Sequence, residues 1–511
     1  MVERLIHRSV SCQAISRRDA VAVVHGAGIT TYGELDELSD AWAARLAECG
    51  VGPGVVVPVR LPRSLDLVVA LLAVLKCGAA YAALDMRWPR QRVHSILERL
   101  DPPLLIGDSG TSQDVAPLPG GIAYWEPPTE PYQGTAHRVP DLEESAPACV
   151  FFTSGTTGIP KGVVSPHGAT TRLFSADGPL PFGPGTVLAQ AAPAPWDAFS
   201  LELWGALTTG GRLVLIEGDY LFPHTVEDLI VEFGVNTMWL TASLFNFMVE
   251  EDIECFAGLD RMYIGGERLS PVHVEQFVSR HSSVALFNGY GPVESCVFAT
   301  VHLISKDDVL AENGIPIGRP VPETSVYILK GDQPASPGEI GEVCIAGSGL
   351  ALGYLHNEAL TREKFVDVDV DGIDVRVYRS GDLAYADDAG VLHFVGRSDQ
   401  QIKVRGHRIE PAEIEVHGNA VPGVAQCAVV PLRGTASEYE GLAFLYTSSA
   451  PAAAGAEAST EEEGIRSLLR EKLPSYVVPD VIKRLERFPV TANGKVDRAA
   501  LASAVVTVAA L

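Results

Sequence analysis

Residues 152–162 read FTSGTTGIPKG, and Phe152 is also the last residue of the apolar run 150–152. A short apolar run of this kind indicates a buried strand, so the glycine-rich segment is expected to form the loop at its end. In such a loop, backbone N–H groups can face an anion, and hydroxyls and a lysine can donate to phosphate oxygens. The G-K-[ST] ending of a Walker loop is absent, and a polar turn is the alternative interpretation. The candidate phosphate ligands are Thr153, Ser154, Gly155, Thr156, Thr157 and Lys161.

Short apolar runs recur on both sides of this loop and predict an α/β fold. They lie at residues 55–57, 104–106, 213–216 and 262–264, and their flanking Gly, Pro, Asp or Thr residues favour strands over buried helices. Helix-patterned segments separate them, and residues 31–34 (TYGE) read as a capping box that begins one such helix. Strands and helices that alternate in this way are typical of layered, largely parallel sheets.

The character of the sequence changes twice in its second half. From about Gly314 it becomes β-rich and is punctuated by glycine, which predicts a smaller β-rich subdomain. A further break lies near residues 396–400, and a unit of mixed strands and helices follows. The predicted architecture is a large N-terminal domain of layered sheets and helices with a β-rich subdomain over residues 1–396, a linker over 397–400, and a small α+β C-terminal domain over 401–511.

Charge and cysteine usage exclude several classes of protein. The 511 residues carry 39 Lys and Arg against 64 Asp and Glu, a formal net charge of −25, which argues against nucleic acid or an anionic membrane as the main partner. The eight cysteines are spread singly, so a disulfide framework or a zinc knuckle is not expected. The N-terminus lacks the apolar core of a signal peptide, and the most apolar stretch, residues 67–75, is too short to span a bilayer. We therefore expect a cytoplasmic protein.

The loop at residues 152–162 resembles the phosphate-loop signature of the adenylate-forming (ANL) superfamily. This superfamily includes acyl-CoA synthetases, firefly luciferase and the adenylation domains of nonribosomal peptide synthetases. Further matches follow in the family's order from about Thr30 to Arg498, so the resemblance covers nearly the whole chain. The early segment 75–81 (LKCGAAY) is one of these matches and has an expected structural role.

The resemblance implies a binding site for ATP and Mg²⁺. Residues 288–294 (NGYGPVE) are similar to the adenine segment, and Val293 stands where the family usually has Thr. Residues 378–382 (YRSGD) are similar to the ribose segment. The implied roles are an adenine-edge contact for Asn288 with Gly289 beside it, ring stacking for Tyr290, Mg²⁺ binding for Glu294, ribose binding for Asp382, and a supporting position for Arg397.

The resemblance also assigns roles in the last quarter of the chain. Residues 396–410 (GRSDQQIKVRGHRIE) are similar to the family's hinge and the strand and loop after it. This implies that Asp399 is the pivot of a mobile C-terminal domain and that Gly406 lets a pantetheine arm pass close to the backbone. Residues 493–498 (NGKVDR) are similar to the segment with the catalytic lysine, here Lys495. Such an ammonium, together with Mg²⁺, stabilises negative charge on phosphoryl oxygens in the transition state.

Residues 196–200 (WDAFS) distinguish between subfamilies. Aligned with peptide-synthetase adenylation domains, Asp197 lies where a carboxylate pairs with the α-ammonium of an amino acid, which would be costly to bury alone. A helix N-cap is the alternative role for Asp197. None of the implied pocket residues is charged, and two glycines leave room beside three aromatic rings, which favours a small to medium aliphatic side chain such as that of valine or 2-aminobutyrate. The pocket residues are Ala198, Leu201, Trp239, Tyr263, Gly265, Gly289, Val297 and Phe298.

The resulting hypothesis is a free-standing adenylation enzyme of nonribosomal peptide (antibiotic) biosynthesis. It would form an aminoacyl-AMP from ATP and then pass the acyl group to the phosphopantetheine thiol of a carrier protein. Only residues 499–511 follow Arg498, so the carrier protein is expected to act in trans, and a small activating protein is a further candidate partner. The alternatives are an acyl- or aryl-CoA ligase of the same superfamily and a catalytically inactive nucleotide-binding module.

Overall fold

The structure is a computed structural model of the 511-residue chain and divides into two compact units. The first unit comprises Met1–Met86, Arg99–Phe152 and Gly162–Ser398, and the second comprises Arg87–Glu98, Thr153–Lys161 and Asp399–Leu511. The last boundary falls inside the predicted linker 397–400. The residues described are 3–108, 110, 113–128, 138–154, 160–175, 178–218, 220–309, 314–370, 372–399, 401–433, 439–448, 456–489, 496 and 498–506.

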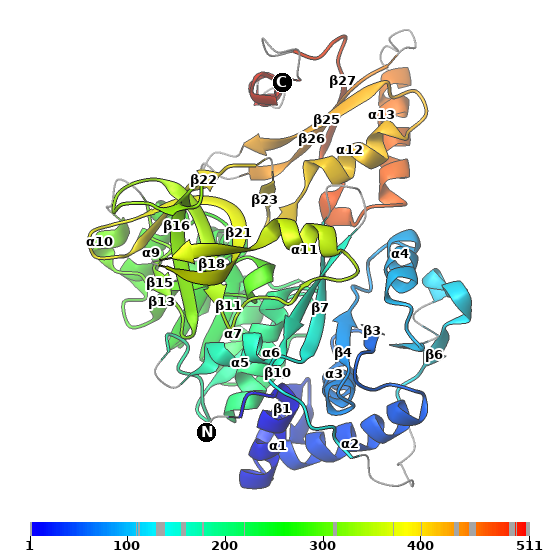
Figure 1. Cartoon of the computed structure of the whole chain (residues 1–511), viewed down its shortest axis with the longest axis vertical. Helices are drawn as coiled ribbons and strands as arrows, with labels where there is room; N and C mark the ends of the chain where they lie inside the picture. Colours follow the sequence, from blue (N-terminus) through cyan, green and yellow to red (C-terminus); the bar gives the residue numbers. More distant parts are fainter. Residues whose placement is uncertain are drawn as a thin grey trace. The chain divides into compact units, whose positions relative to one another are not determined.

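A nine-stranded sheet forms the centre of the first unit. Its described strands run in the order β15-β14-β13-β12-β11-β9-β10-β1-β2. Figure 1 labels β1, β10, β11, β13 and β15 of this sheet. The six strands from β13 to β1 are parallel, whereas β2 pairs antiparallel with β1, β14 with β13, and β15 with β14. The strands are β1 (Val21–His25), β2 (Gly28–Thr31), β9 (Val187–Gln190), β10 (Arg212–Leu215), β11 (Thr237–Thr241), β12 (Arg261–Gly265), β13 (Ala285–Tyr290), β14 (Thr300–Leu303) and β15 (Arg319–Pro320).

A second sheet of seven described strands, in the order β19-β8-β7-β4-β3-β5-β6, completes the α/β part. Its strands are β3 (Val56–Arg60), β4 (Ala80–Ala83), β5 (Leu104–Gly107), β6 (Ala123–Trp125), β7 (Pro147–Thr153), β8 (Lys161–Pro166) and β19 (Gly353–Tyr354). Strand β7 leads into the glycine-rich loop, as the apolar run at 150–152 predicts.

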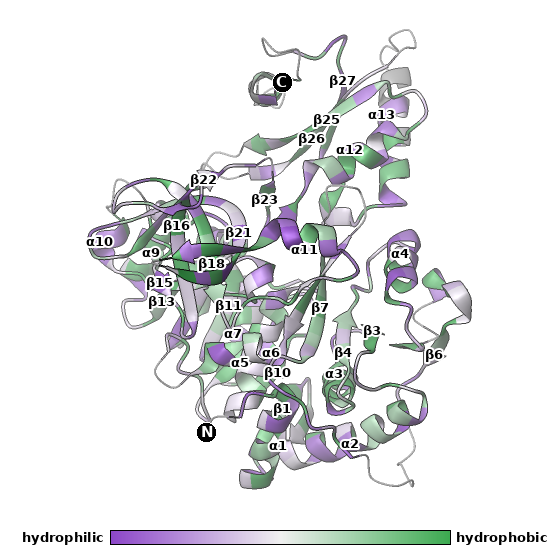
Figure 2. Ribbon diagram, in the orientation of Figure 1, coloured by the Kyte–Doolittle hydropathy of each residue, from purple (hydrophilic) through white to green (hydrophobic). Residues whose placement is uncertain are grey.

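Four helices share one hydrophobic core with both sheets. They are α1 (Ile6–Ser16), α2 (Tyr32–Glu48), α3 (Leu65–Lys76) and α6 (Asp197–Thr209). Every residue of α3 from Leu67 to Lys76 is buried, and Figure 2 shows α3 and strand β7 in the hydrophobic colour. The predicted capping box is confirmed, because the Thr31 hydroxyl accepts from the Glu34 N–H and the Glu34 side chain accepts from the Thr31 N–H. The layered α/β architecture is thus confirmed.

The opposite face of the nine-stranded sheet is covered by α7 (Pro223–Val231), α8 (Ala242–Asp252) and α9 (Pro271–Arg280). Neighbouring residues of one strand enter different cores, because successive side chains of a strand point to opposite faces. Val23 belongs to the core of α1, α2, α3 and α6, whereas Val24 belongs to the core of α7, α8 and α9. Both faces of the sheet are therefore buried, as expected for a largely parallel sheet.

The predicted β-rich subdomain is a six-stranded antiparallel sheet in the described part of the first unit. Its path is β17-β16-β18-β21-β20, and β22 pairs with β21. The strands are β16 (Thr324–Lys330), β17 (Gln333–Pro334), β18 (Gly341–Gly347), β20 (Phe365–Val370), β21 (Ile373–Ala386) and β22 (Leu392–Arg397). Within the described ranges, no helix is both long enough and apolar enough to cross a membrane.

The second unit is built around a three-stranded sheet of β25 (Gln426–Arg433), β26 (Tyr439–Thr447) and β27 (Val481–Arg484). A hairpin of β23 (Ile402–Val404) and β24 (His407–Ile409) precedes it. Its described helices include α12 (Pro411–Asn419), α13 (Ala456–Arg470), α14 (Arg498–Val506) and most of α4 (Arg90–Leu100). Residues 87–98 join this unit through a buried ion pair of 3.0 Å between Arg92 and Glu413.

Candidate active site

Asp197 is the first residue of α6 and is held by two backbone N–H groups. Its Oδ1 accepts from Ala198 at 3.0 Å and its Oδ2 accepts from Val297 at 2.9 Å. Trp196, not Asp197, occupies the N-cap position, so the alternative role of Asp197 as an N-cap is wrong. A carboxylate in the first turn of a helix is stabilised by the helix dipole. Two backbone N–H groups therefore orient the carboxylate of Asp197.

The predicted pocket residues are brought together around the carboxyl ends of β11, β12 and β13. Trp239 pairs with Tyr263 across β11 and β12, and Gly265 pairs with Gly289 across β12 and β13. The rings of Tyr263 and Phe298 are stacked, with centroids 6.4 Å apart. The remaining members are Ala198 and Leu201 on α6 and Val297 in the loop before β14, all of them buried.

The two pocket glycines do not leave open space, so that part of the prediction is wrong. A Cβ atom at Gly289 would overlap the ring of Phe298, and one at Gly265 would overlap the carbonyl oxygen of Gly289. Glycine is needed at both positions because a ring or a neighbouring backbone approaches closely. The space beside each glycine is therefore occupied by protein atoms.

The loop that carries Val297 has an unusual backbone. Cys296 and Val297 have φ angles of 52° and 64°, in the left-handed region. This region is strained for residues other than glycine and is a genuine outlier for a β-branched residue. Val297 uses this conformation to direct its N–H to Asp197. The sequence does not predict this conformation, because neither Cys296 nor Val297 is a residue type that commonly adopts a positive φ, such as Gly, Asn or Asp.

Three of the predicted nucleotide residues form one cluster. The Tyr290 hydroxyl donates to Asp382 Oδ2 at 2.6 Å, and Arg397 donates to Asp382 Oδ1. Asp382 and Arg397 are also paired across β21 and β22. Burial, together with the nearby carboxylate of Asp382, raises the pKa of Tyr290 well above its usual value, so its phenol remains a donor. Asn288 is buried and donates to the carbonyl of Pro316 at 2.7 Å.

Glu294 lies on the short helix Val293–Ser295 and is fully buried. The Tyr354 hydroxyl donates to its Oε1 at 2.7 Å, a partner that the sequence did not reveal. Among the described residues, no group of three or more His, Cys, Asp or Glu side chains could enclose a metal ion. This arrangement fits Mg²⁺, which is commonly bound by one or two carboxylates together with substrate phosphates and water.

The phosphate loop belongs to the second unit and is described in part. The Thr153 hydroxyl is buried and has no hydrogen-bond partner among the described residues, so it fits a ligand that accepts a hydrogen bond. Ser154 donates to the carbonyl of Arg408 at 3.0 Å, and the Lys161 ammonium lies 3.9 Å from a carboxylate oxygen of Glu410. Lying outside the described residues are Gly155, Thr156, Thr157 and the predicted catalytic residue Lys495.

Two features of the predicted hinge and pantetheine path are described. The Asp399 carboxylate accepts from the N–H of Gln401 at 3.2 Å, directly after the boundary between the units. Gly406 has a φ of 79°, a conformation that favours glycine.

Glu202 is a buried carboxylate near the site that sequence reasoning missed. Its Oε2 accepts from the N–H groups of Ala191 and Ala192, at 3.0 and 2.9 Å, and from the Gln190 amide at 3.2 Å. It therefore fixes the segment that leads from β9 to Asp197. Burial raises the pKa of Glu202 to about 8. The available signal was a single acid in the apolar helical run 198–207.

A Glu202→Gln variant should change how stability depends on pH. Because the folded-state pKa of about 8 exceeds the ordinary value of 4.5, Glu202 stabilises the fold below pH 4.5, and this contribution is lost as pH rises through about 8. Glutamine does not titrate, so the melting temperature of the variant relative to the wild type should increase across this range. The full effect corresponds to a few kcal/mol, as an order of magnitude. A difference in melting temperature that is independent of pH would contradict the assignment.

Comparison with known proteins identifies the family. Residues 11–355 match the family model described as AMP-binding enzyme, and residues 413–495 match the AMP-binding enzyme C-terminal domain. Malpibaldin synthetase of Mortierella alpina is 38% identical over 506 residues, and bacitracin synthase 3 of Bacillus licheniformis is 33% identical over 510 residues. Each alignment covers 98% of this chain, but the chain spans only 9% and 8% of the lengths of these two relatives.

A solved structure gives a match of similar extent. The holo form of PA1221, a nonribosomal peptide synthetase protein containing adenylation and PCP domains and bound to a vinylsulfonamide inhibitor, is 32% identical. The superposition has a TM-score of 0.87 and covers 98% of this chain and 85% of that chain. The chain therefore belongs to the AMP-binding enzymes, a family of adenylating ligases, and within it to the adenylation domains of nonribosomal peptide synthetases.

Proposed function

We propose that the chain activates a small to medium aliphatic α-amino acid, such as valine or 2-aminobutyrate, in two half-reactions. In the first, the substrate carboxylate attacks the α-phosphorus of ATP, and aminoacyl-AMP and pyrophosphate are formed. In the second, the phosphopantetheine thiol of a separate carrier protein attacks the acyl carbon, which gives a thioester and releases AMP. The observation that carries the proposal is the carboxylate of Asp197, held by two backbone N–H groups beside a pocket of uncharged residues.

Asp197 supports an amine-bearing substrate. An ammonium group removed from water needs a charged partner, because leaving it unpaired costs several kcal/mol. A fatty or aryl acid needs no carboxylate at this position. The fixed orientation of Asp197 thus favours amino-acid activation over an acyl- or aryl-CoA ligase.

The buried aromatic lining supports a substrate side chain of limited size. Phe298 fills the space over Gly289, and Tyr263 is fixed because its hydroxyl donates to the carbonyl of Pro179 at 3.0 Å. Neither ring can withdraw without losing these contacts. Valine and 2-aminobutyrate match this pocket better than leucine or an aromatic amino acid.

The nucleotide roles follow the clusters described above. Asp382, oriented by Tyr290 and Arg397, would accept from the ribose hydroxyls, and Asn288 with Gly289 would contact the adenine. Thr153, Ser154 and Lys161, with Gly155, Thr156 and Thr157, would donate to the phosphates, and Lys495 would donate to the reacting phosphoryl group. Glu294 would hold Mg²⁺, which neutralises charge on phosphate oxygens.

We further propose that the C-terminal domain, residues 401–511, moves about Asp399 between the half-reactions. The boundary between the compact units at Ser398 and Asp399 supports this position for the hinge. The adenylation and PCP domains of PA1221 support a carrier protein as partner, here supplied in trans, and a small activating protein is a further proposed partner. ATP and a carrier protein as co-substrates favour the cytoplasm.

Pyrophosphate exchange with a panel of amino acids tests the proposal. We expect exchange with valine and 2-aminobutyrate and little exchange with 3-methylbutanoate, the analogue of valine without its amine. If no amino acid supports exchange, the proposal is wrong. Exchange with carboxylic acids alone would favour the CoA-ligase alternative, and ATP binding without exchange on any acid would favour an inactive module.

A Phe298→Ala variant should accept larger side chains. Removing the ring opens the space over Gly289, so the kcat/KM ratio of leucine to valine in pyrophosphate exchange should rise by about tenfold or more. Phe247→Ala, which changes a partly exposed ring on α8, is the control and should leave the ratio unchanged. An equal loss of activity for both amino acids would show that Phe298 does not limit the pocket.

A further inference from the structure

Arg172 is a buried cation outside the predicted site. It begins the short helix Arg172–Phe174, directly after α5 (His167–Thr171), and its side chain is fully buried. Burial lowers the pKa of Arg172 to about 10. Because this value is still well above 7, the guanidinium remains charged at neutral pH. A buried charge is tolerated when its donors are satisfied by hydrogen bonds. Because burying a charged guanidinium costs free energy, the groups that accept its hydrogen bonds indicate what Arg172 holds in place.

The acceptors of Arg172 are mostly backbone carbonyl oxygens. Nη2 donates to the carbonyls of Ser295 and Phe298, each at 2.8 Å, and Nη1 donates to the carbonyl of Ala169. Nε donates to the hydroxyl of Thr324 at 3.2 Å. One nitrogen thus bridges two carbonyls of the loop that carries the substrate-facing Val297.

The two bridged carbonyls flank the strained residues. Cys296 and Val297, the left-handed pair, lie between Ser295 and Phe298. Strained backbone persists only where surrounding contacts hold it. The bridge from Arg172 spans the pair and is a contact of this kind. Arg172 therefore stabilises a backbone conformation that the residues of the loop would not favour by themselves.

This conformation determines two features of the amino-acid pocket. It directs the N–H of Val297 to the carboxylate of Asp197, and it places the Phe298 ring over Gly289. We propose that Arg172 is a positioning residue for the amino-acid substrate, acting through the loop 295–298 on the ammonium-binding carboxylate and on the pocket wall. This inference rests on the proposed function of Asp197.

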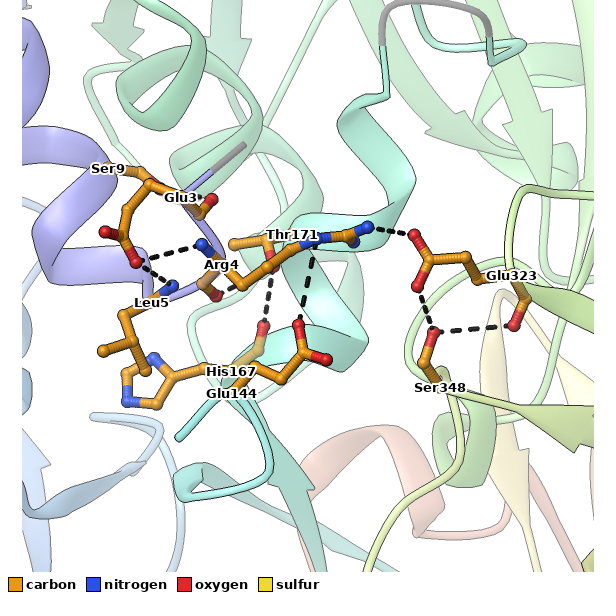
Figure 3. A network of polar contacts seen from close by, with 9 residues as sticks. All are labelled: Glu3, Arg4, Leu5, Ser9, Glu144, His167, Thr171, Glu323 and Ser348. Atoms are coloured by element: carbon orange, nitrogen blue, oxygen red, sulfur yellow. Dashed lines mark hydrogen bonds and ion pairs between the residues drawn. The ribbon is translucent and has the colours of Figure 1, made fainter. Parts of the chain in front are cut away.

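A polar network includes Thr171, which directly precedes Arg172 in the chain, and Glu323 (Figure 3). Arg4 forms an ion pair with Glu323, the residue before Thr324, and its carbonyl accepts from the hydroxyl of Thr171 at 2.9 Å. Ser348 donates to Glu323 at 2.9 Å. The negative charge of Glu323 favours the charged form of Arg172 and opposes the effect of burial.

The close packing at Gly349 shows how tightly the guanidinium is enclosed. A Cβ atom at this position would overlap the Arg172 guanidinium. The group therefore has little freedom to move away from the two carbonyls. Lysine, a point charge without the planar fork, cannot bridge both carbonyls and the Thr324 hydroxyl in the same way.

Steady-state pyrophosphate exchange with an Arg172→Lys variant tests the proposal. The KM for the amino acid should rise by about tenfold, because the variant loses hydrogen bonds from the Arg172 guanidinium that position the loop 295–298. The KM for ATP should stay within about twofold of the wild-type value. The preference for valine over 3-methylbutanoate should fall. Equal increases in both KM values, or no change in either, would overturn the proposal.

A second substitution separates positioning from general destabilisation. Glycine adopts positive φ without strain, so Cys296→Gly in the Arg172→Lys background should recover a large part of the lost amino-acid affinity. Cys255→Gly in the same background is the matched control, because Cys255 is also a buried thiol but lies in a regular helical turn, Ile253–Phe256. Recovery by both variants alike, or by neither, would show that Arg172 does not act through the strained pair.

The controls also separate this inference from the proposed function. Melting temperature and ATP binding of each variant show whether the fold is retained. If the wild type exchanges with no amino acid, the proposed function is wrong. If the wild type exchanges and Arg172→Lys has an unchanged KM for the amino acid, only the role of Arg172 is wrong.

Discussion

An Asp197→Ala variant should lose roughly 100- to 4,000-fold in kcat/KM for valine in pyrophosphate exchange. Removing one partner of a buried ion pair costs about 3–5 kcal/mol, and each 1.4 kcal/mol corresponds to about tenfold. The remaining ammonium would face the positive end of α6, and the N–H groups of Ala198 and Val297 would lose their acceptor. The loss should appear in the kinetic parameters of the amino acid, while ATP binding is retained.

Three measurements make this result specific. Asp197→Asn keeps a carbonyl acceptor but has no charge, so it should lose nearly as much activity as the alanine variant. The activity of Asp197→Ala on 3-methylbutanoate should be unchanged or higher, because that acid brings no ammonium. Asp228→Ala removes an exposed carboxylate on α7 and should behave as the wild type. Full activity of Asp197→Ala on valine would contradict the role of Asp197.

A Lys495→Ala variant should lose about 100- to 1,000-fold in the adenylation rate, the range observed when a single group that stabilises transition-state charge is removed. Attack of one anion on another concentrates negative charge on phosphoryl oxygens, and an ammonium group offsets that charge. The second half-reaction has a different requirement, because the proposed domain movement removes Lys495 before the thiol attacks. Thioester formation from supplied valyl-AMP and a holo carrier protein should therefore stay within about twofold of the wild type.

Comparing the two half-reactions in one preparation gives the test of Lys495. Pyrophosphate exchange measures the first, and transfer of labelled valine from valyl-AMP to the carrier protein measures the second. Lys306→Ala, at an exposed position on α10 (Lys306–Val309), is the control and should affect neither. Equal losses in both half-reactions would contradict an adenylation-specific role for Lys495.

Local patterns in the sequence predicted the elements that local physics determines. The capping box at Thr31 and Glu34 and the apolar run before the phosphate loop depend on residues within a few positions of one another, and both were found where expected. The pocket residues were predicted from the family resemblance, and the strand order brings several of them together. This part of the site is therefore encoded in segments short enough to recognise.

The sequence did not reveal features that depend on distant contacts. The sequence does not show the partners of Arg172 and Glu202, which are both fully buried and bind backbone groups of other segments. The left-handed conformation of Val297 is held from more than a hundred positions away in the chain. The pocket glycines were misinterpreted for the same reason, because the ring over Gly289 is placed by that loop.

The contacts of residues 3–5 with the network of Figure 3 matter for experiments that exchange adenylation domains between synthetases. The family match begins at residue 11, but the network in Figure 3 includes Glu3, Arg4 and Leu5 and reaches Glu323, beside the Thr324 anchor of Arg172. A domain exchange with its junction at residue 11 would transfer the residues from 11 onward without Glu3, Arg4 and Leu5, and so without the Arg4–Glu323 ion pair. Such a chimera is expected to lose amino-acid selectivity before nucleotide binding, so an exchange junction should lie ahead of Glu3.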